Sequence, residues 1–324
     1  VTPVWGREAE VEKLRDLYSR AKNGDGQVVL LEGEAGIGKT RLLDHFLDGL
    51  QATGEQPRVL FGSCVTARGE GVGGALLQAL RDGLGEEDLR DALSRYLVAV
   101  PGILADFTAL LERRPPPEGA TTLTPAALQT AVVEIIRAMA EEQVTLVLLD
   151  DLHHASRDEL ELVASLARSV RRHRVLLVGT RRPREADAWW EDLARHYGGV
   201  SLALDRLRPK ELLKLVEGAL GSKELTKQLS YLLASKSDGN PFFALEILES
   251  LRERGVIRRR PDGSWDTSDV DLAIEVPSAI EDLILVRLSH LTREERELLE
   301  IAACAGHEFD PLLLSGALGQ APIQ

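Results

Sequence analysis

Five short runs of apolar residues divide the first two-thirds of the chain, and many of their members are β-branched. The runs cover residues 28–32, 58–62, 144–150, 174–180 and 200–204. Each run is almost continuously apolar, which is typical of strands that are covered on both faces. Between the runs, apolar residues recur at steps of three and four, which indicates amphipathic helices. Strands that alternate with helices predict a parallel α/β sheet.

The last third of the chain has a mainly helical pattern. We expect three helices here, over residues 210–220, 225–235 and 241–255. Asn240 is suited to cap the third helix and Pro241 to occupy its first position. Residues 258–268 contain an Asp-Gly pair and predict a hairpin or a surface loop. Residues 280–318 are predicted to be helical again.

The charge of the chain narrows the possible classes of function. Among 324 residues, 52 Asp and Glu exceed 39 Lys and Arg, so the net charge is −13. Such a chain is a poor non-specific binder of nucleic acid or of an anionic membrane. No apolar run approaches the roughly 20 residues of a membrane span, and no signal-peptide pattern is present. Two isolated cysteines form neither a disulfide framework nor a zinc site. We expect a cytoplasmic protein, of which this chain is a piece.

Residues 33–40 read GEAGIGKT and fit the phosphate-loop motif G-x-x-x-x-G-K-[ST]. An expected strand precedes the motif and an expected helix follows it. The glycines let the backbone wrap around phosphates, and the free N–H groups of the helix start face the same anion. Lys39 is expected to reach the β- and γ-phosphates, and Thr40 to offer its hydroxyl to Mg²⁺. The residues expected to hold the phosphates are Gly33, Glu34, Ala35, Gly36, Ile37, Gly38, Lys39, Thr40 and Arg41.

Two carboxylates, Asp150 and Asp151, end the apolar run of residues 144–150. A strand end beside a phosphate loop is the place for an aspartate that holds a metal ion. We expect Asp150 to hold Mg²⁺ through water, because Mg²⁺ loses its waters reluctantly. Asp151 is expected to orient or deprotonate the attacking water. The alternative is a strand end with two solvated acids.

Arg181 and Arg182 follow the run of residues 174–180. Either guanidinium is suited to face the γ-phosphate and report its presence, and the alternative is a pair of solvated arginines. His153 and His154 follow the carboxylates. Because Mg²⁺ prefers oxygen ligands, surface or packing roles are expected for both histidines.

Six stretches of the chain match one protein family in the order of that family. They are PVWGREAEVEKL at residues 3–14, GEAGIGKTRLL at 33–43, LVLLDDLHHAS at 146–156, VGTRRP at 178–183, GNPFFALEILESL at 239–251 and the segment 276–310. Together they resemble the STAND-type (signal-transduction) ATPases, a branch of the AAA+ superfamily. The resemblance is strongest to the ATPase modules of large bacterial LuxR-type transcriptional regulators and multidomain nucleotide cyclases.

The resemblance implies a P-loop NTPase fold of the α/β class. A nucleotide-binding domain with a five-stranded parallel sheet is expected at residues 1–207. A helical lid is expected at 208–275, and a truncated winged helix at 276–324. The implied ligands are ATP or ADP and Mg²⁺.

The resemblance also assigns roles to single residues. In the family, the segment that matches Val4, Trp5 and Arg7 lies against the adenine. The proline that matches Pro241 closes over the base, and the arginine that matches Arg182 senses the phosphate. The catalytic residues would then be Lys39, Asp151 and Arg182.

The resulting hypothesis is a nucleotide-operated switch. ADP would hold the lid and winged helix on the sheet domain, exchange for ATP would permit self-association, and slow hydrolysis would reset the state. Sensor and output domains are expected elsewhere in the protein. The chain departs from the family pattern at His154, Ser156 and Arg181. These departures leave nucleotide binding intact and leave the hydrolysis rate open.

Two other functions stay open. One is a DNA-loading AAA+ ATPase of the origin-recognition type. In residues 258–324, however, six Arg and no Lys stand against thirteen Asp and Glu, whereas a DNA-binding surface normally carries a basic stripe. The other is a vigorous ATPase motor, because the sequence does not identify the arginine that would complete the site of a neighbouring subunit.

Overall fold

The computed structural model describes residues 4–64, 74–85, 88–115, 123–183, 188–259, 265–267, 288 and 291–305. The chain divides into two compact units, Val1–Asp205 and Arg206–Gln324. Within the described ranges, no helix combines the length and apolar character that crossing a membrane requires.

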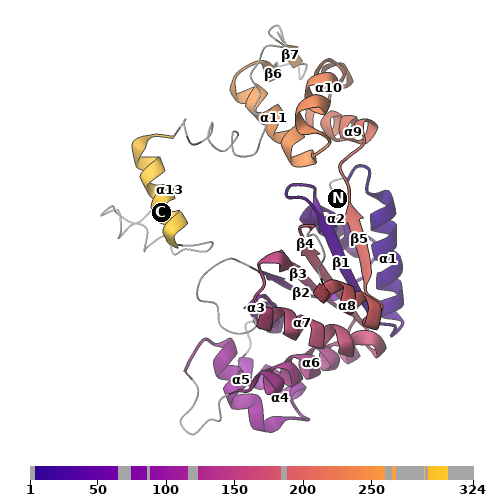
Figure 1. The fold of residues 1–324 in the computed structure, drawn as a ribbon, viewed down its shortest axis with the longest axis vertical. Coiled ribbons are helices and arrows are strands. Elements are labelled where there is room, and N and C mark those ends of the chain that lie inside the picture. Colours follow the sequence, from indigo (N-terminus) through magenta and orange to yellow (C-terminus); the bar gives the residue numbers. More distant parts are fainter. Residues whose placement is uncertain are drawn as a thin grey trace. The chain divides into compact units, whose positions relative to one another are not determined.

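The first unit is built on a parallel sheet of five strands, in the order β2-β3-β4-β1-β5 (Figure 1). The strands are β1 (Gln27–Gly33), β2 (Arg58–Ser63), β3 (Thr145–Asp150), β4 (Val175–Arg181) and β5 (Val200–Leu204). The register pairs Glu32 with Arg181 and Ser63 with Asp150, so the polar ends of the strands meet along one edge. The predicted parallel α/β sheet and its strands are confirmed.

Helices cover both faces of this sheet (Figure 1). One face carries α1 (Glu8–Lys22) and α2 (Lys39–Ala52), and the other carries α3 (Gly74–Leu84), α6 (Pro125–Glu142), α7 (Arg157–Ser169) and α8 (Ala188–Tyr197). Two shorter helices, α4 (Leu89–Tyr96) and α5 (Leu104–Leu111), pack on α3.

Alternate residues of β1 point to opposite faces of the sheet. Val29 and Leu31 pack with α1 and α2, whereas Val28 and Leu30 join the core on the other face. Fully burying a leucine of this kind contributes roughly 1.5–3 kcal/mol relative to leaving it exposed. The nearly continuous apolar runs of the central strands therefore reflect burial on both sides.

The edge strand β2 departs from the prediction that every strand is covered on both faces. Leu60 is fully buried in the core beside α3, but Val59 is 38% and Phe61 is 47% exposed. One face of β2 is exposed because α1 and α2 pack on the central strands β1 and β4. In the other edge strand, β5, exposed and half-buried residues alternate over residues 200–203, and Leu204 is buried. The prediction of cover on both faces is therefore wrong for the two strands at the edges of the sheet.

The second unit begins with three helices around a shared apolar core that includes Val216, Leu229 and Ile247. They are α9 (Pro209–Leu220), α10 (Lys223–Ser237) and α11 (Pro241–Glu253), followed by an antiparallel hairpin of β6 (Ile257–Arg259) and β7 (Trp265–Thr267). The indole N–H of Trp265 donates to the Leu220 carbonyl at 2.7 Å and fastens the hairpin to α9. The three predicted helices and the hairpin are confirmed.

Further along the chain, α13 (Arg293–Ala305) is the described part of the helical segment predicted at residues 280–318. Apart from residues 288, 291 and 292, the rest of that segment lies outside the described residues, as does most of the winged helix predicted at 276–324. The division into domains at residues 1–207, 208–275 and 276–324 thus stays a prediction.

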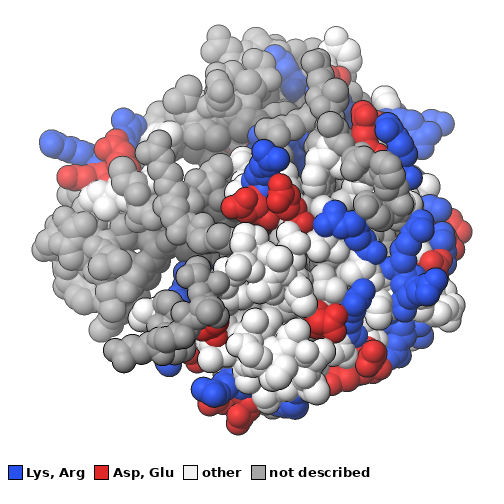
Figure 2. Space-filling view, turned by 60° about the horizontal axis from the view of Figure 1, so that its bottom comes forward, with Lys and Arg blue, Asp and Glu red and all other residues white. Residues whose placement is uncertain are grey.

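Charged side chains of both signs share the face of the molecule that Figure 2 shows. Lys and Arg gather toward the right of this view, and Asp and Glu stand beside them with uncharged residues between. Among the described residues of this face, the surface charge is therefore mixed.

Candidate functional site

The phosphate-loop motif forms the turn between β1 and α2, at the carboxyl edge of the sheet. Gly36 and Gly38 have positive φ angles of 74° and 99°, which glycine adopts without steric cost. A Cβ atom at Gly33 would lie 2.6 Å from the side chain of the buried Ile37, so a larger residue does not fit. The loop therefore turns tightly in front of α2, whose free N–H groups favour an anion.

Lys39, the first residue of α2, is directed back into the loop. It is 8% exposed, and its Nζ donates to the carbonyl oxygens of Gly33 at 2.9 Å and Glu34 at 3.1 Å. Burial lowers the pKa of Lys39, while the carboxylates of Asp151 and Asp150 act in the opposite direction. A largely desolvated cation thus lies beside the positive end of a helix, an arrangement that suits a phosphate group.

Asp150 brings together three segments that are far apart in sequence. Thr40 Oγ1 donates to Asp150 Oδ2 at 3.2 Å, and Thr180 Oγ1 donates to Asp150 Oδ1. The backbone N–H of Asp151 donates to Thr180 Oγ1 at 2.9 Å. Thr40 and Asp150, the two residues predicted to hold Mg²⁺, are therefore direct neighbours.

Thr180 is the member of this cluster that the sequence reasoning missed. It is completely buried near the end of β4, and its hydroxyl both accepts and donates a hydrogen bond. The sequence does contain a signal for this role, a threonine near the end of an otherwise apolar strand. Its meaning depends on the strand order, which places β4 directly beside β3 and thus beside Asp150.

The oxygen atoms around Asp150 suit Mg²⁺, which prefers hard oxygen ligands. One carboxylate and one hydroxyl are sufficient, because Mg²⁺ that is bound with a nucleotide takes its remaining ligands from phosphates and water. In the part of the chain that the structure describes, no three His, Cys, Asp or Glu side chains form a separate metal cluster.

Asp151 has a left-handed backbone conformation, with a φ of 55°, which is uncommon for residues other than glycine. Its side chain is 41% exposed, whereas that of His153 is 8% exposed. Burial lowers the pKa of His153, and the neighbouring His154 acts in the same direction, so the uncharged imidazole is favoured. The rings of His153 and His154 lie 4.0 Å apart, and His154 is exposed. The two histidines thus occupy packed and surface positions.

The two arginines at the end of β4, Arg181 and Arg182, have different surroundings. Arg181 is buried, and its guanidinium pairs with Glu32 on the adjacent β1, with Nε 2.6 Å from Oε1. The other oxygen of Glu32 accepts from Ser201 Oγ of β5 at 2.8 Å. Arg182 is exposed, and its positive charge contributes to the lowered pKa of Lys39. Of the two candidates, the exposed Arg182 is the better placed to meet a phosphate.

Arg7 ties the N-terminal segment to the phosphate loop. Its guanidinium is buried, and Nη2 donates to the carbonyl oxygens of Asp205 at 2.5 Å and Ile37 at 3.5 Å. Val4 packs against the apolar cluster of α1 and α2, and Trp5 is half-buried. The segment therefore lies beside the loop, while the contact of Val4, Trp5 and Arg7 with adenine stays a prediction.

Pro241 begins α11 in the second unit. The side chain of Asn240 caps this helix by accepting a hydrogen bond from the Phe242 N–H at 3.1 Å. The predicted cap and the predicted first position of the helix are thus confirmed. The contact of Pro241 with a nucleotide base stays a prediction.

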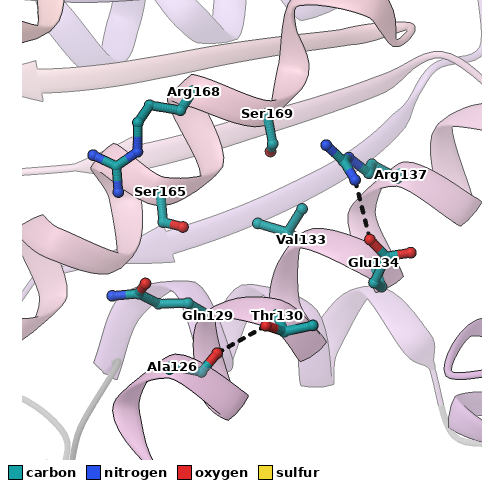
Figure 3. Close-up of a pocket in the computed structure, with 9 residues that line it drawn as sticks. All are labelled: Ala126, Gln129, Thr130, Val133, Glu134, Arg137, Ser165, Arg168 and Ser169. Atoms are coloured by element: carbon teal, nitrogen blue, oxygen red, sulfur yellow. Dashed lines mark hydrogen bonds and ion pairs between the residues drawn. The ribbon is translucent and has the colours of Figure 1, made fainter. Parts of the chain in front are cut away.

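A hollow of about 510 Å³ lies between α6 and α7, away from the phosphate loop (Figure 3). Its lining includes Ser165 and Arg168 of α7, and Glu134 and Arg137 of α6, which form an ion pair at 3.1 Å. None of the predicted site residues lines it. This hollow therefore adds nothing to the candidate site at the carboxyl edge of the sheet.

A parallel sheet with a phosphate loop after its first strand and carboxylates after its third defines a P-loop NTPase. The family comparison is more specific. Residues 3–178 match the AAA ATPase domain, and the chain belongs to this family of ATPases.

Three similar proteins extend the comparison. An uncharacterized protein of Rhizobium meliloti (strain 1021) is 27% identical over 332 residues, which are 98% of this chain and 31% of that protein. A STAND protein with a tetratricopeptide repeat sensor from Pyrococcus horikoshii shares the fold, with a TM-score of 0.54 and 19% identity over all of this chain and 38% of that one. The structure of the ORC1 protein of Aeropyrum pernix in a complex with DNA has a TM-score of 0.49 and a sequence identity of 15%. The match covers 98% of this chain and 83% of that one.

The chain spans about a third of the length of the Rhizobium and Pyrococcus proteins. The comparisons confirm the predicted P-loop NTPase fold of the α/β class. The family match confirms the predicted AAA-type ATPase module.

Proposed function

We propose that the chain is a regulatory switch that binds ATP and ADP and hydrolyses ATP slowly with Mg²⁺. It would control the oligomerisation or the output of a larger signalling or transcription-regulatory protein. The observation that carries this proposal is the hydrogen-bonded cluster of Thr40, Asp150 and Thr180 beside the loop that holds Lys39. A hydroxyl, a carboxylate and an ammonium group in this arrangement are the parts that phosphoryl transfer requires.

In this proposal the loop from Gly33 to Arg41 surrounds the phosphates with its backbone N–H groups. Lys39 exchanges its two carbonyl partners for the β- and γ-phosphates. Oxygen atoms of Thr40 and Asp150 would hold Mg²⁺, which neutralises phosphate charge when it is bound. Arg182, exposed near Lys39, would contact the γ-phosphate.

Asp151 has the accessible carboxylate that hydrolysis needs. We propose that it accepts a proton from a water molecule while the water oxygen attacks the γ-phosphorus. The bond to the bridging oxygen breaks, and ADP and phosphate are released. Arg181 is paired with Glu32, which leaves Arg182 as the guanidinium proposed for the γ-phosphate.

We propose self-association in the ATP-bound state, with sensor and output regions outside this chain. Direct binding of nucleic acid is not part of the proposal. The net charge is −13, and acidic residues outnumber arginines thirteen to six in residues 258–324. A switch of this kind needs only that two states of the protein bind ATP and ADP with different affinities.

Identification of the nucleotide that is released on denaturation tests the proposal, together with titrations of ATP and ADP with and without Mg²⁺. We expect retained ADP and a turnover below about 1 s⁻¹, the low end of ordinary enzymes. A purified chain that binds neither nucleotide would refute the proposal. Rapid turnover would favour a motor instead.

A further inference from the structure

His153 has a buried polar side chain whose hydrogen-bonding groups lack partners among the described residues. Its side chain is 8% exposed, yet neither ring nitrogen has a hydrogen-bond partner among the described residues. Burying a polar group without such a partner costs free energy, so an apolar side chain would pack here at lower cost. Packing alone therefore does not account for an imidazole at this position.

The nearest acceptor is the carboxylate of Asp151, whose Oδ1 lies 3.7 Å from His153 Nδ1. A hydrogen bond between nitrogen and oxygen needs about 2.7–3.2 Å, so an approach of roughly 0.7 Å closes the gap. The backbone of Asp151 is held by Thr180, and the ring of His153 is held by burial. A rotation of the Asp151 side chain is therefore the motion that brings the two groups together.

The charges around His153 favour an uncharged ring that donates. Burial disfavours the imidazolium most, and among the described residues His154, Arg182 and Lys39 act in the same direction, whereas Asp151 favours it. A neutral imidazole carries one N–H, and a proton on Nδ1 would be directed toward Asp151.

We propose that His153 is a positioning residue for ATP hydrolysis. Its Nδ1–H donates to Oδ1 of Asp151 and holds Oδ2 ready to accept the proton of the attacking water. His153 touches neither nucleotide nor water and acts only through Asp151. This inference rests on the proposed ATPase function and adds a residue to it.

Two variants separate positioning from packing. His153→Leu keeps the apolar bulk and removes the donor, and we expect kcat to fall about 10-fold to 100-fold, the range for a lost hydrogen bond to a charged group. His153→Asn places an amide N–H near the former Nδ1 and should keep most of the activity. The KM for ATP should stay unchanged in both, because Asp151 acts on water. His154→Leu, at the exposed neighbour, is the matched control and should leave kcat unchanged.

A double-mutant cycle with Asp151→Asn completes the test. If His153 acts through Asp151, His153→Leu should cost almost nothing further once Asp151 is replaced. A packing residue would give independent losses of kcat in the two backgrounds, together with a lower melting temperature.

Three results would overturn the role of His153: unchanged kcat in His153→Leu, equal losses in the Leu and Asn variants, or additive losses in the cycle. If His153→Leu does not fold, His153→Phe, which keeps a ring and also removes the donor, takes its place in the comparison with His153→Asn and in the cycle. Titration of the parent with ADP distinguishes a failure of the proposed function from a failure of the positioning role. A parent that binds no nucleotide refutes the proposed function itself, whereas binding and hydrolysis without a His153 effect refute only the positioning role.

Discussion

Replacing Thr180 with Val removes a hydroxyl from the centre of the site and leaves the shape of the side chain almost unchanged. The hydroxyl donates to Asp150 Oδ1 and accepts from the Asp151 N–H at 2.9 Å. Thr180 is completely buried, so water does not replace the missing group. The Asp151 N–H keeps a second acceptor, Asp150 Oδ1 at 3.2 Å, so the main loss is the hydrogen bond from Thr180 to the charged Asp150, and such bonds contribute about 1.5–3 kcal/mol. We expect the free energy of unfolding to fall by about 2 kcal/mol.

This loss should lower the melting temperature by about 4–8 °C, given roughly 2–4 °C per kcal/mol for a unit of about 200 residues. The effect on function should be larger, because Asp150 loses a fixed orientation. We expect Thr180→Val to slow ATP hydrolysis at least about tenfold and to raise the Mg²⁺ concentration that hydrolysis requires. Thr180→Ser keeps the hydroxyl and loses one methyl group, at a cost of about 1 kcal/mol, and serves as the control.

The assay is phosphate release at saturating ATP over a range of Mg²⁺ concentrations, with thermal unfolding of the same samples. Equal hydrolysis and equal Mg²⁺ dependence in the parent, Thr180→Val and Thr180→Ser would refute the assignment of this cluster as the working site. A common loss in both variants would point to packing instead of the hydroxyl.

Three further predictions concern nucleotide binding and hydrolysis. Lys39→Ala should abolish binding of ATP and ADP in titrations and leave the circular dichroism spectrum unchanged, because the ammonium group serves the loop and not the core; unchanged affinity would contradict the phosphate-loop assignment. Asp151→Asn should bind ATP as the parent does but release phosphate at least about 100-fold more slowly, since an amide does not accept the proton, whereas Asp150→Asn should weaken the Mg²⁺ dependence of ATP binding. Pro241→Ala should weaken ADP binding and expose the second unit to proteolysis; equal affinity and equal protection would reject a contact of this residue with the nucleotide.

Features that depend on neighbouring residues in the chain could be predicted from the sequence. The central strands, the helices of the second unit and the phosphate loop follow from local patterns of apolar residues, glycine and caps. Lys39 and Thr40 can be assigned because one turn of chain fixes their spacing from the glycines. Asp150 can be assigned because it ends a buried strand, and the carboxyl end of such a strand lies at the same edge of a parallel sheet as the phosphate loop.

Features that depend on the lateral order of strands could not be predicted. Thr180 gains its partners only because β4 lies between β1 and β3. The pairing of Arg181 with Glu32 also follows from this order, and it distinguishes two arginines that look equivalent in the sequence. The exposed face of β2 was missed for the same reason, since an apolar run does not reveal whether its strand lies at an edge.

The guanidinium of Arg7 has a practical consequence for anyone who shortens this protein. Its acceptor at 2.5 Å is the carbonyl of Asp205, the last residue of the first unit. A version of the first unit that starts after Arg7 would lack this guanidinium. A version that ends at Leu204 would leave the buried guanidinium without the Asp205 carbonyl as its acceptor, at a cost of about 1.5–3 kcal/mol. The boundaries of a working fragment are therefore set by one side chain that fastens the beginning of the unit to its end.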